Sequence, residues 1–163
     1  MNLLQPKTIK QPSFLLMYSA LQYAPEEIAK PDGSLSLPYL AGALRDESYD
    51  VDILDVSVGN KNDKLKDTFF NTTYLSSGLI RCGMSRERIQ QEIANYDVIG
   101  VSSIFTAQTS MVLELIRTVK EIAPEKLVLT GGVNARNLRN RFFESGADII
   151  CLSEAEITIV QIA

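Results

Sequence analysis

Residues 97–132 read DVIGVSSIFTAQTSMVLELIRTVKEIAPEKLVLTGG and divide into three patterns. Asp97–Ser103 is a short apolar run that ends in two serines, which is typical of a strand buried on both faces. Apolar residues then recur at helical spacing before Pro124, at Met111, Val112, Leu115, Ile116, Val119 and Ile122. A second apolar run, Lys126–Thr130, leads into Gly131-Gly132. Strand, helix and strand predict a right-handed parallel crossover, which places Ser102 and Ser103 beside the two glycines.

Three further apolar runs extend this pattern on both sides. They are Phe14–Tyr18, Val51–Asp55 and Asp148–Leu152. The expected strands are therefore residues 14–18, 51–55, 98–102, 126–130 and 148–152. Strands that alternate with helices predict an α/β fold, here a doubly wound, flavodoxin-like (Rossmann-like) five-stranded parallel sheet in the order 2-1-3-4-5.

The segments between these strands carry weaker signals. Prolines and a glycine indicate turns over residues 21–34, and Leu37, Leu40, Ala41 and Leu44 indicate a core-facing helix that Ser36 could cap. Periodicity fades over residues 61–83, which we interpret as an insertion with at most a short helix. Helix caps are expected at Ser85 and at Asn134, with Gly146 ending the second of these helices. Ser153-Glu-Ala-Glu156 has the spacing of a capping box for a final helix.

Composition limits the classes of function. The 163 residues, 45% of them apolar, suit a single domain over 1–163, with a polar, frayed start over 1–12. The net charge of −4 and the scattered basic residues argue against nucleic-acid binding. Cys82 and Cys151 have no metal-site or redox-site spacing, and no apolar run has membrane-spanning length. We therefore expect a reduced, cytoplasmic protein that binds neither nucleic acid nor membrane.

In a doubly wound sheet, ligands bind outside the carboxyl ends of the strands, where the winding direction reverses. The walls of such a site are expected to be residues 19–34, 102–108 and 131–134, with 153–156 at the far rim. Each wall has a competing structural interpretation. The double glycine could serve a tight turn, Ser102 and Ser103 could cap strand ends, and Glu154 and Glu156 could simply begin a helix.

Several segments, in order, carry a family resemblance. They are Leu37–Leu44, Tyr49–Asp55, Gly83–Ile89, Tyr96–Ser102, Gly131-Gly132 and Asp148–Glu156. Ser102-Ser-Ile104 and Gly131, the first glycine of the pair, have 26 residues between them. Together they resemble the N-terminal cobalamin-binding domain of cobalamin-dependent radical S-adenosylmethionine enzymes. The resemblance implies cobalamin contacts at the four strand ends: Ser19 and Ala20; Ser102, Ser103, Ile104, Phe105 and Thr106; Gly131, Gly132, Val133 and Asn134; Ser153 and Glu154.

The departures from the family are informative. The chain contains no His, so the Asp-x-His-x-x-Gly loop that supplies an axial ligand in many cobalamin proteins is missing, and cobalamin would bind without a protein His. Ser153 and Ala155 replace the usual glycines. The Cys-x3-Cys-x2-Cys motif for an iron–sulfur cluster is also missing, so the cluster and S-adenosylmethionine are expected only in a C-terminal radical domain of a longer parent protein.

Three functions follow as alternatives. The leading interpretation is a cobalamin-binding module that presents its cofactor to that C-terminal radical catalytic domain, and is not catalytic alone. The second is a degenerate domain that binds no cofactor and serves a structural or interaction role. The third is a flavin-binding or receiver-like module, which the Ser19-Ala20 pair disfavours, because a receiver needs acidic residues there and a flavin site needs a hydroxyl-rich loop.

Overall fold

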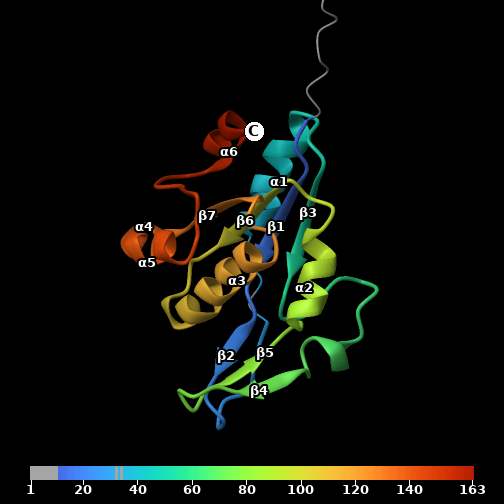
Figure 1. Ribbon diagram of the computed structural model, residues 1–163, viewed down its shortest axis with the longest axis vertical. Helices are drawn as coiled ribbons and strands as arrows, with labels where there is room; N and C mark the ends of the chain where they lie inside the picture. The colour runs from blue at the N-terminus through green and yellow to red at the C-terminus, as the bar shows by residue number, and fades with distance from the viewer. Residues whose placement is uncertain (1–10, 32, 34) are drawn as a thin grey trace, which may run out of the picture.

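The computed structural model describes residues 11–31, 33 and 35–163. Five parallel strands form its main sheet: β1 (Phe14–Tyr18), β3 (Val51–Asp55), β6 (Val98–Ser102), β7 (Leu127–Gly131) and β8 (Ile149–Ile150). They lie in the order β3-β1-β6-β7-β8 (Figure 1), which is 2-1-3-4-5 along the chain. The predicted doubly wound fold is therefore confirmed. The frayed start predicted over 1–12 falls largely on residues 1–10, which lie outside the described residues.

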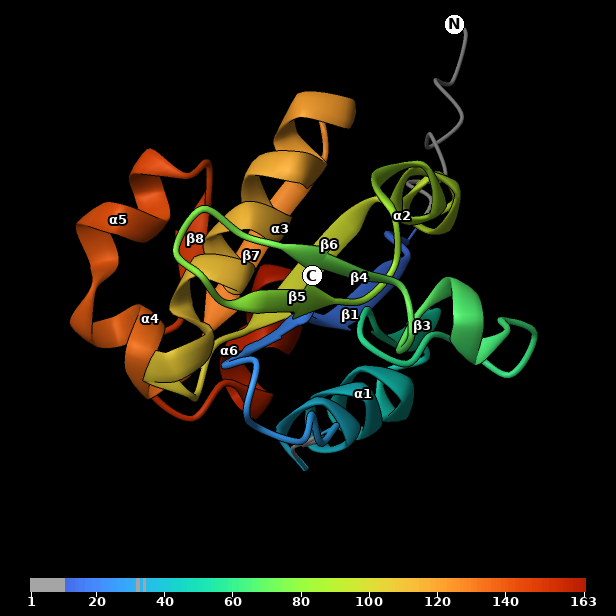
Figure 2. The same ribbon diagram turned by 90° about the horizontal axis from the view of Figure 1, so that it is seen from below.

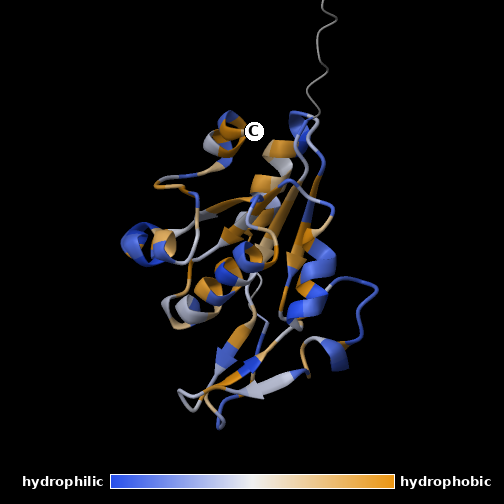
Figure 3. Cartoon of the chain, viewed as in Figure 1, coloured by the Kyte–Doolittle hydropathy of each residue, from blue (hydrophilic) through white to orange (hydrophobic). Residues whose placement is uncertain are grey.

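Helices cover both faces of this sheet. On one face α2 (Arg86–Ile93), α3 (Thr109–Ile122), α4 (Val133–Asn137) and α5 (Arg139–Glu144) pack over Leu15, Met17 and Ile99. On the other face α1 (Ser36–Asp46) and α6 (Glu156–Ile162) pack over Leu16 and Leu129. Alternate residues of β1 thus enter opposite cores, and Figure 3 shows the apolar colour gathered on the sheet and the inward helix faces. Within the described part of the chain, none of the helices is long and apolar enough to cross a bilayer.

Strand limits differ slightly from the prediction. β7 begins and ends one residue later than expected, and β8 is only two residues long. The pairing of β8 nevertheless continues on both sides, because Asp148 N donates to Val128 O (2.9 Å) and Cys151 N to Thr130 O (2.8 Å).

One of the four predicted helix caps is confirmed. Ser85 accepts a hydrogen bond from Arg88 N at the start of α2. Ser36 was wrongly predicted as a cap, because the Tyr18 hydroxyl, from the end of β1, accepts from Leu37 N (3.4 Å) and Ser36 is already helical. Asn134 lies inside α4, which is separated from α5 at Leu138. Ser153 precedes α6, whose N-cap residue is Ala155, so the capping box was also wrong.

A second, antiparallel sheet was not predicted. It consists of β2 (Leu21–Tyr23), β5 (Ile80–Cys82) and β4 (Thr72–Tyr74), in that order, and a short 3₁₀ turn, η1 (Leu65–Asp67), precedes β4. The interpretation of 21–34 as turns alone and of 61–83 as at most a short helix was therefore wrong. These strands have three residues each, and all of β4 is exposed, so no apolar alternation marks them.

The small sheet is fixed beyond the carboxyl end of β1, as Figures 1 and 2 show. The side-chain amide of Gln108, at the end of η2 (Thr106–Gln108), pairs with both main-chain groups of Gln22: Gln22 N donates to Gln108 Oε1 (2.8 Å), and Gln108 Nε2 donates to Gln22 O (3.0 Å). On the same side, Arg81 Nε of β5 lies 2.8 Å from Glu114 Oε1 of α3. These contacts join the small sheet to the segment that follows β6.

The junction of β6 and β7 is tighter than a normal strand pair. Ser102 pairs with Gly131, and Ser103 N donates to Gly131 O (2.9 Å) one residue beyond β6. Gly132 then adopts φ +100°, and a Cβ atom placed there would overlap the main-chain carbonyl of Ser103. Gly131 has more room, since its Cβ would lie 3.5 Å from Cys151 Cβ, an ordinary contact. Only the second glycine is therefore required by the turn.

We expect Gly132→Ala to lower the free energy of unfolding by roughly 1–3 kcal/mol or more, through positive-φ strain and the clash with Ser103. Gly131→Ala is the matched control and should change it by less than about 1 kcal/mol. Urea denaturation of both variants measures the difference. Equal effects of the two substitutions would contradict the geometry at this turn.

Tyr96, in the loop before β6, provides a pH-dependent link to β3. Burial, together with the hydrogen bond that its hydroxyl donates to Asp52 Oδ2 (2.7 Å), raises the pKa of Tyr96 above its ordinary value. The folded state therefore favours the protonated phenol. Its stabilising contribution is present below the unfolded pKa of about 10 and is lost as the pH rises above it.

We accordingly expect wild-type protein to lose stability more steeply than Tyr96→Phe above about pH 10. Below that pH the difference in unfolding free energy between the two proteins should stay constant. Unfolding free energies measured from pH 7 to 11 test this, and parallel curves throughout would show that Tyr96 does not couple folding to protonation.

Candidate functional site

The strand ends of β6, β7 and β8 open into one pocket on the face of the sheet that α1 and α6 cover. It has a volume of about 310 Å³. We call it the carboxyl-edge pocket; its lining residues are Leu16, Ser36, Leu37, Leu40, Gly100, Val101, Ser102, Ile104, Leu129, Thr130, Gly131, Gly132, Val133, Arg136, Cys151, Leu152, Ser153, Glu154, Ala155, Glu156 and Ile159. The two strand ends of the central crossover thus meet at a cavity.

Apolar side chains form the inner walls of this pocket. Leu16 and Leu129 come from the sheet, Leu37 from α1 and Ile159 from α6, and all four belong to the same core cluster. Each is buried where its helix or strand passes the pocket. Because rigid elements carry these residues, the apolar walls are fixed by the fold rather than by mobile loops.

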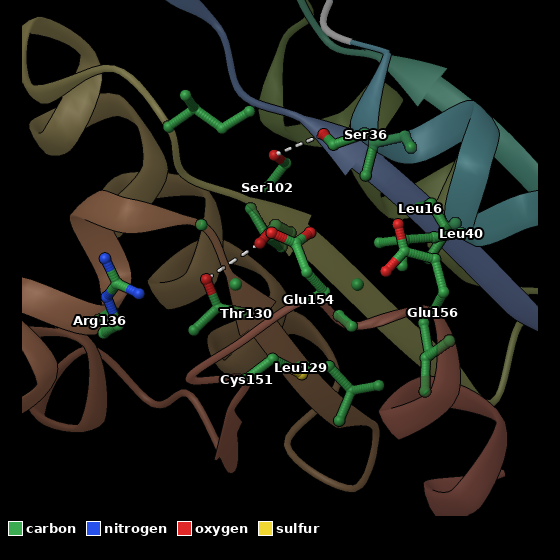
Figure 4. A pocket seen from close by; sticks show the side chains of 18 of the residues that line it. Leu16, Ser36, Leu40, Ser102, Leu129, Thr130, Arg136, Cys151, Glu154 and Glu156 are labelled. Carbon is green, nitrogen blue, oxygen red and sulfur yellow. Dashed lines mark hydrogen bonds between the residues drawn. The ribbon is translucent and has the colours of Figure 1, made fainter.

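Polar groups line the rest of the carboxyl-edge pocket. Ser102 Oγ lies 3.3 Å from Ser36 Oγ of α1, which joins the two sides of the opening. Thr130 Oγ1 is engaged, donating to Val101 O at 2.9 Å. Figure 4 shows Glu156 beside Leu40 at one end of the pocket and Arg136 at the other end. Glu154 lies between these two ends.

Cys151 is the pocket residue that could act as a nucleophile. It is 7% exposed, and this burial raises the pKa of its thiol, so the reactive thiolate is disfavoured. Across residues 11–31, 33 and 35–163, the structure has no group of three or more His, Cys, Asp or Glu side chains that could hold a metal ion. The Cys151 thiol is therefore a poor nucleophile in this pocket.

Of the residues predicted to contact a ligand, seven line the carboxyl-edge pocket. They are Ser102, Ile104, Gly131, Gly132, Val133, Ser153 and Glu154. Ser19, Ser103 and Phe105 instead line a smaller hollow of about 40 Å³ between β1 and β6. Ala20, Thr106 and Asn134 line neither of these pockets.

Ser103 and Asn134 are occupied by structural contacts. Asn134 Nδ2 donates to Ser103 Oγ and to Thr109 Oγ1, both at 2.9 Å, and Asn134 N donates to Ser103 O at 3.2 Å. Ser103 and Asn134 are each 1% exposed, and Asn134 Oδ1 has no hydrogen-bond partner among the described residues. This network holds the loop after β6 against α4. Ser103 therefore has a structural role that does not require a ligand.

Sequence reasoning missed most of the pocket outside the strand ends. Leu37 and Leu40 were interpreted only as the core face of a helix, and Leu16 and Leu129 only as strand interior. Arg136 was counted only among the scattered basic residues of the chain. The strand order places α1 and α6 on the same face, and this packing, which no local motif encodes, brings these residues together.

A larger hollow, of about 450 Å³, lies away from the strand ends at the start of α2. Two of its charged side chains form an ion pair: Arg88 Nε lies 2.8 Å from Asp63 Oδ1. Burial alone would raise the pKa of Asp63, but hydrogen bonds from Arg88 and Asn60 hold it below its ordinary value. This hollow lies on the surface beside an ion pair and away from the strand ends, so the carboxyl-edge pocket is the better candidate for a ligand site.

The chain is 26% identical over 161 residues to cytidylyl-2-hydroxyethylphosphonate methyltransferase of Streptomyces wedmorensis, covering 96% of this chain and 29% of that protein. The chain thus spans less than a third of the length of this relative.

Solved structures with the same fold belong to different functional classes. A cobalamin-binding protein of Desulfitobacterium hafniense has a TM-score of 0.55 at 14% identity, over 92% of this chain and 58% of that one. The activated receiver domain of DrrB, from Thermotoga maritima, has a TM-score of 0.53 at 13% identity, over 94% and 95%. At such identities the likeness shows the fold alone.

A match to a protein family identifies the family of this chain, which the shared fold alone does not. The B12 binding domain model matches residues 33–163, which include α1, the strands from β3 onward and every segment around the carboxyl-edge pocket except Leu16 of β1. The chain belongs to the B12-binding domain family.

Proposed function

We propose that this domain binds cobalamin with the nucleotide tail in the carboxyl-edge pocket, and presents the cofactor to the catalytic domain of a radical S-adenosylmethionine enzyme. The observation that carries the proposal is the open pocket at the ends of β6 and β7. Its volume of about 310 Å³ is small for a ligand site, since such sites typically span roughly 300–1,000 Å³, and therefore suits one end of a large cofactor.

The lining of the pocket fits a nucleotide tail. The leucines and Ile159 offer an apolar slot for a planar base, and the hydroxyls of Ser36, Ser102 and Ser153 can pair with ribose or phosphate oxygens. No aromatic side chain is among the described residues that line it. Gly131 lacks a Cβ where the backbone borders the cavity, so a ligand can approach closely.

The parent context of the proposal rests on one sequence comparison. The methyltransferase of S. wedmorensis is far longer than this chain, which is compatible with a module that works beside a catalytic domain. When bound, cobalamin would supply the organometallic chemistry, a methyl transfer or a rearrangement, while the protein positions it. The C-terminal radical domain with its iron–sulfur cluster and S-adenosylmethionine, and the cytoplasmic location, remain parts of this proposal.

The degenerate-domain alternative rests on Ser153 and Ala155, which stand in the pocket wall where the family usually has glycine. Both side chains are small and leave the cavity open. Titration with cobalamin separates the two functions, because a degenerate domain would not bind the cofactor at all.

We expect hydroxocobalamin to bind the purified chain with a changed visible spectrum, and Gly131→Val to weaken binding by about tenfold or more, equivalent to ~1.4 kcal/mol. The added methyl groups would enter the pocket, whereas a side chain at Gly132 would clash with the main-chain carbonyl of Ser103. Gly42→Val, a matched change in α1 with no atom within 4 Å of its Cβ, should bind as the unmodified chain does. Absorbance titration gives the affinities, and thermal unfolding confirms that both variants fold. No spectral change for the unmodified chain would establish the degenerate alternative.

The second expectation concerns the cobalt. These 163 residues contain no His, so a protein imidazole is unavailable, and a tail held in the pocket cannot also coordinate the metal. The electron paramagnetic resonance spectrum of bound cob(II)alamin should therefore lack nitrogen superhyperfine splitting. Persistent splitting would mean that the base still coordinates cobalt and that the tail lies outside the pocket.

A further inference from the structure

Arg136 is an unpaired cation at the edge of the carboxyl-edge pocket. It belongs to α4, lines the pocket and is exposed. Among the residues that the structure describes, no acceptor forms a hydrogen bond or ion pair with its guanidinium. Other arginines of the chain are engaged, for example Arg81 with Glu114 and Arg88 with Asp63. Arg136 is thus free to bind a group that the protein itself does not provide.

The pocket is ordered along its length. Leu16, Leu40 and Glu156 stand at the α1 side, and Arg136 stands at the α4 side, as Figure 4 shows. Glu154 lies between them, so the lining carries two carboxylates and one guanidinium. An anionic ligand group is consequently disfavoured near the glutamates and favoured at the Arg136 end, where the positive charge is.

We infer that Arg136 makes this site selective for corrinoids that carry a phosphate-containing nucleotide tail over tail-less corrinoids. The inference rests on the proposed function, because it assigns a role within the same pocket. The base of the tail occupies the apolar slot, its ribose hydroxyls donate toward Glu154 or Glu156, and its phosphodiester accepts hydrogen bonds from Arg136.

The chemistry of both partners supports this pairing. A phosphodiester is anionic at neutral pH, and a guanidinium presents a planar set of donors that matches two phosphate oxygens. The chemical groups of the tail occur in the same order as their partners along the pocket. The aromatic base matches the leucines, the sugar matches Glu154, and the phosphate matches Arg136. A tail-less corrinoid such as cobinamide offers Arg136 no anion.

The test compares hydroxocobalamin and aquocobinamide as probes on four proteins: the unmodified chain, Arg136→Gln, Arg136→Lys and Arg139→Gln. Arg139 is an exposed arginine of α5 that does not line the pocket, and it serves as the matched control. Dissociation constants are measured by absorbance titration at low and high salt.

We expect the unmodified chain and Arg139→Gln to prefer cobalamin. In Arg136→Gln the cobalamin affinity should fall by roughly three- to tenfold while cobinamide affinity stays the same, because the contact is exposed and charge-assisted. Arg136→Lys should keep part of the preference, and added salt should reduce the difference.

Two outcomes would overturn the inference alone: Arg136→Gln weakening both corrinoids equally, or leaving the preference for cobalamin unchanged. Binding of neither corrinoid by the unmodified chain would instead refute the proposed function, and this inference with it. A wrong role for Arg136 can therefore be distinguished from a wrong proposed function.

Discussion

The close approach of Gly132 to the main-chain carbonyl of Ser103 is the constraint on which the site depends. It exists because β6 and β7 are paired up to Ser102 and Gly131, and one further hydrogen bond joins Ser103 to Gly131. Asn134 then anchors the loop after β6 through its side chain and main chain. The strand ends can therefore separate only if this junction opens, which gives the pocket a rigid base.

Two groups of elements build the site together. The parallel strands supply Ser102, Thr130 and Gly131 at one sheet edge, and α1 and α6 supply the wall that faces them. The Ser36–Ser102 contact is where the two groups meet. Since α1 precedes most of the sheet in the chain and α6 follows it, the cavity forms only when the whole doubly wound order is complete.

The sequence predicted the sheet because buried parallel strands read as nearly continuous apolar runs, as β1 and β6 do most clearly. It also placed Ser102 beside Gly131 correctly, since crossover handedness and strand direction follow from general rules. It failed where signals were not local. The three short strands of the small sheet have no apolar period, and Asn134 looks like a helix cap although it is a buried link to Ser103 and Thr109. Arg136 carried no motif, and only the folded chain shows it at a pocket.

The pairing of Gln108 with both main-chain groups of Gln22 has a consequence for how the small sheet can grow. A side-chain amide here takes the place of a neighbouring strand, so the outer edge of β2 is blocked at its middle residue. The opposite edge, β4, is short and fully exposed. Edge-to-edge association through the small sheet, whether with another chain or with a second copy of this one, is thereby directed to β4 and away from β2.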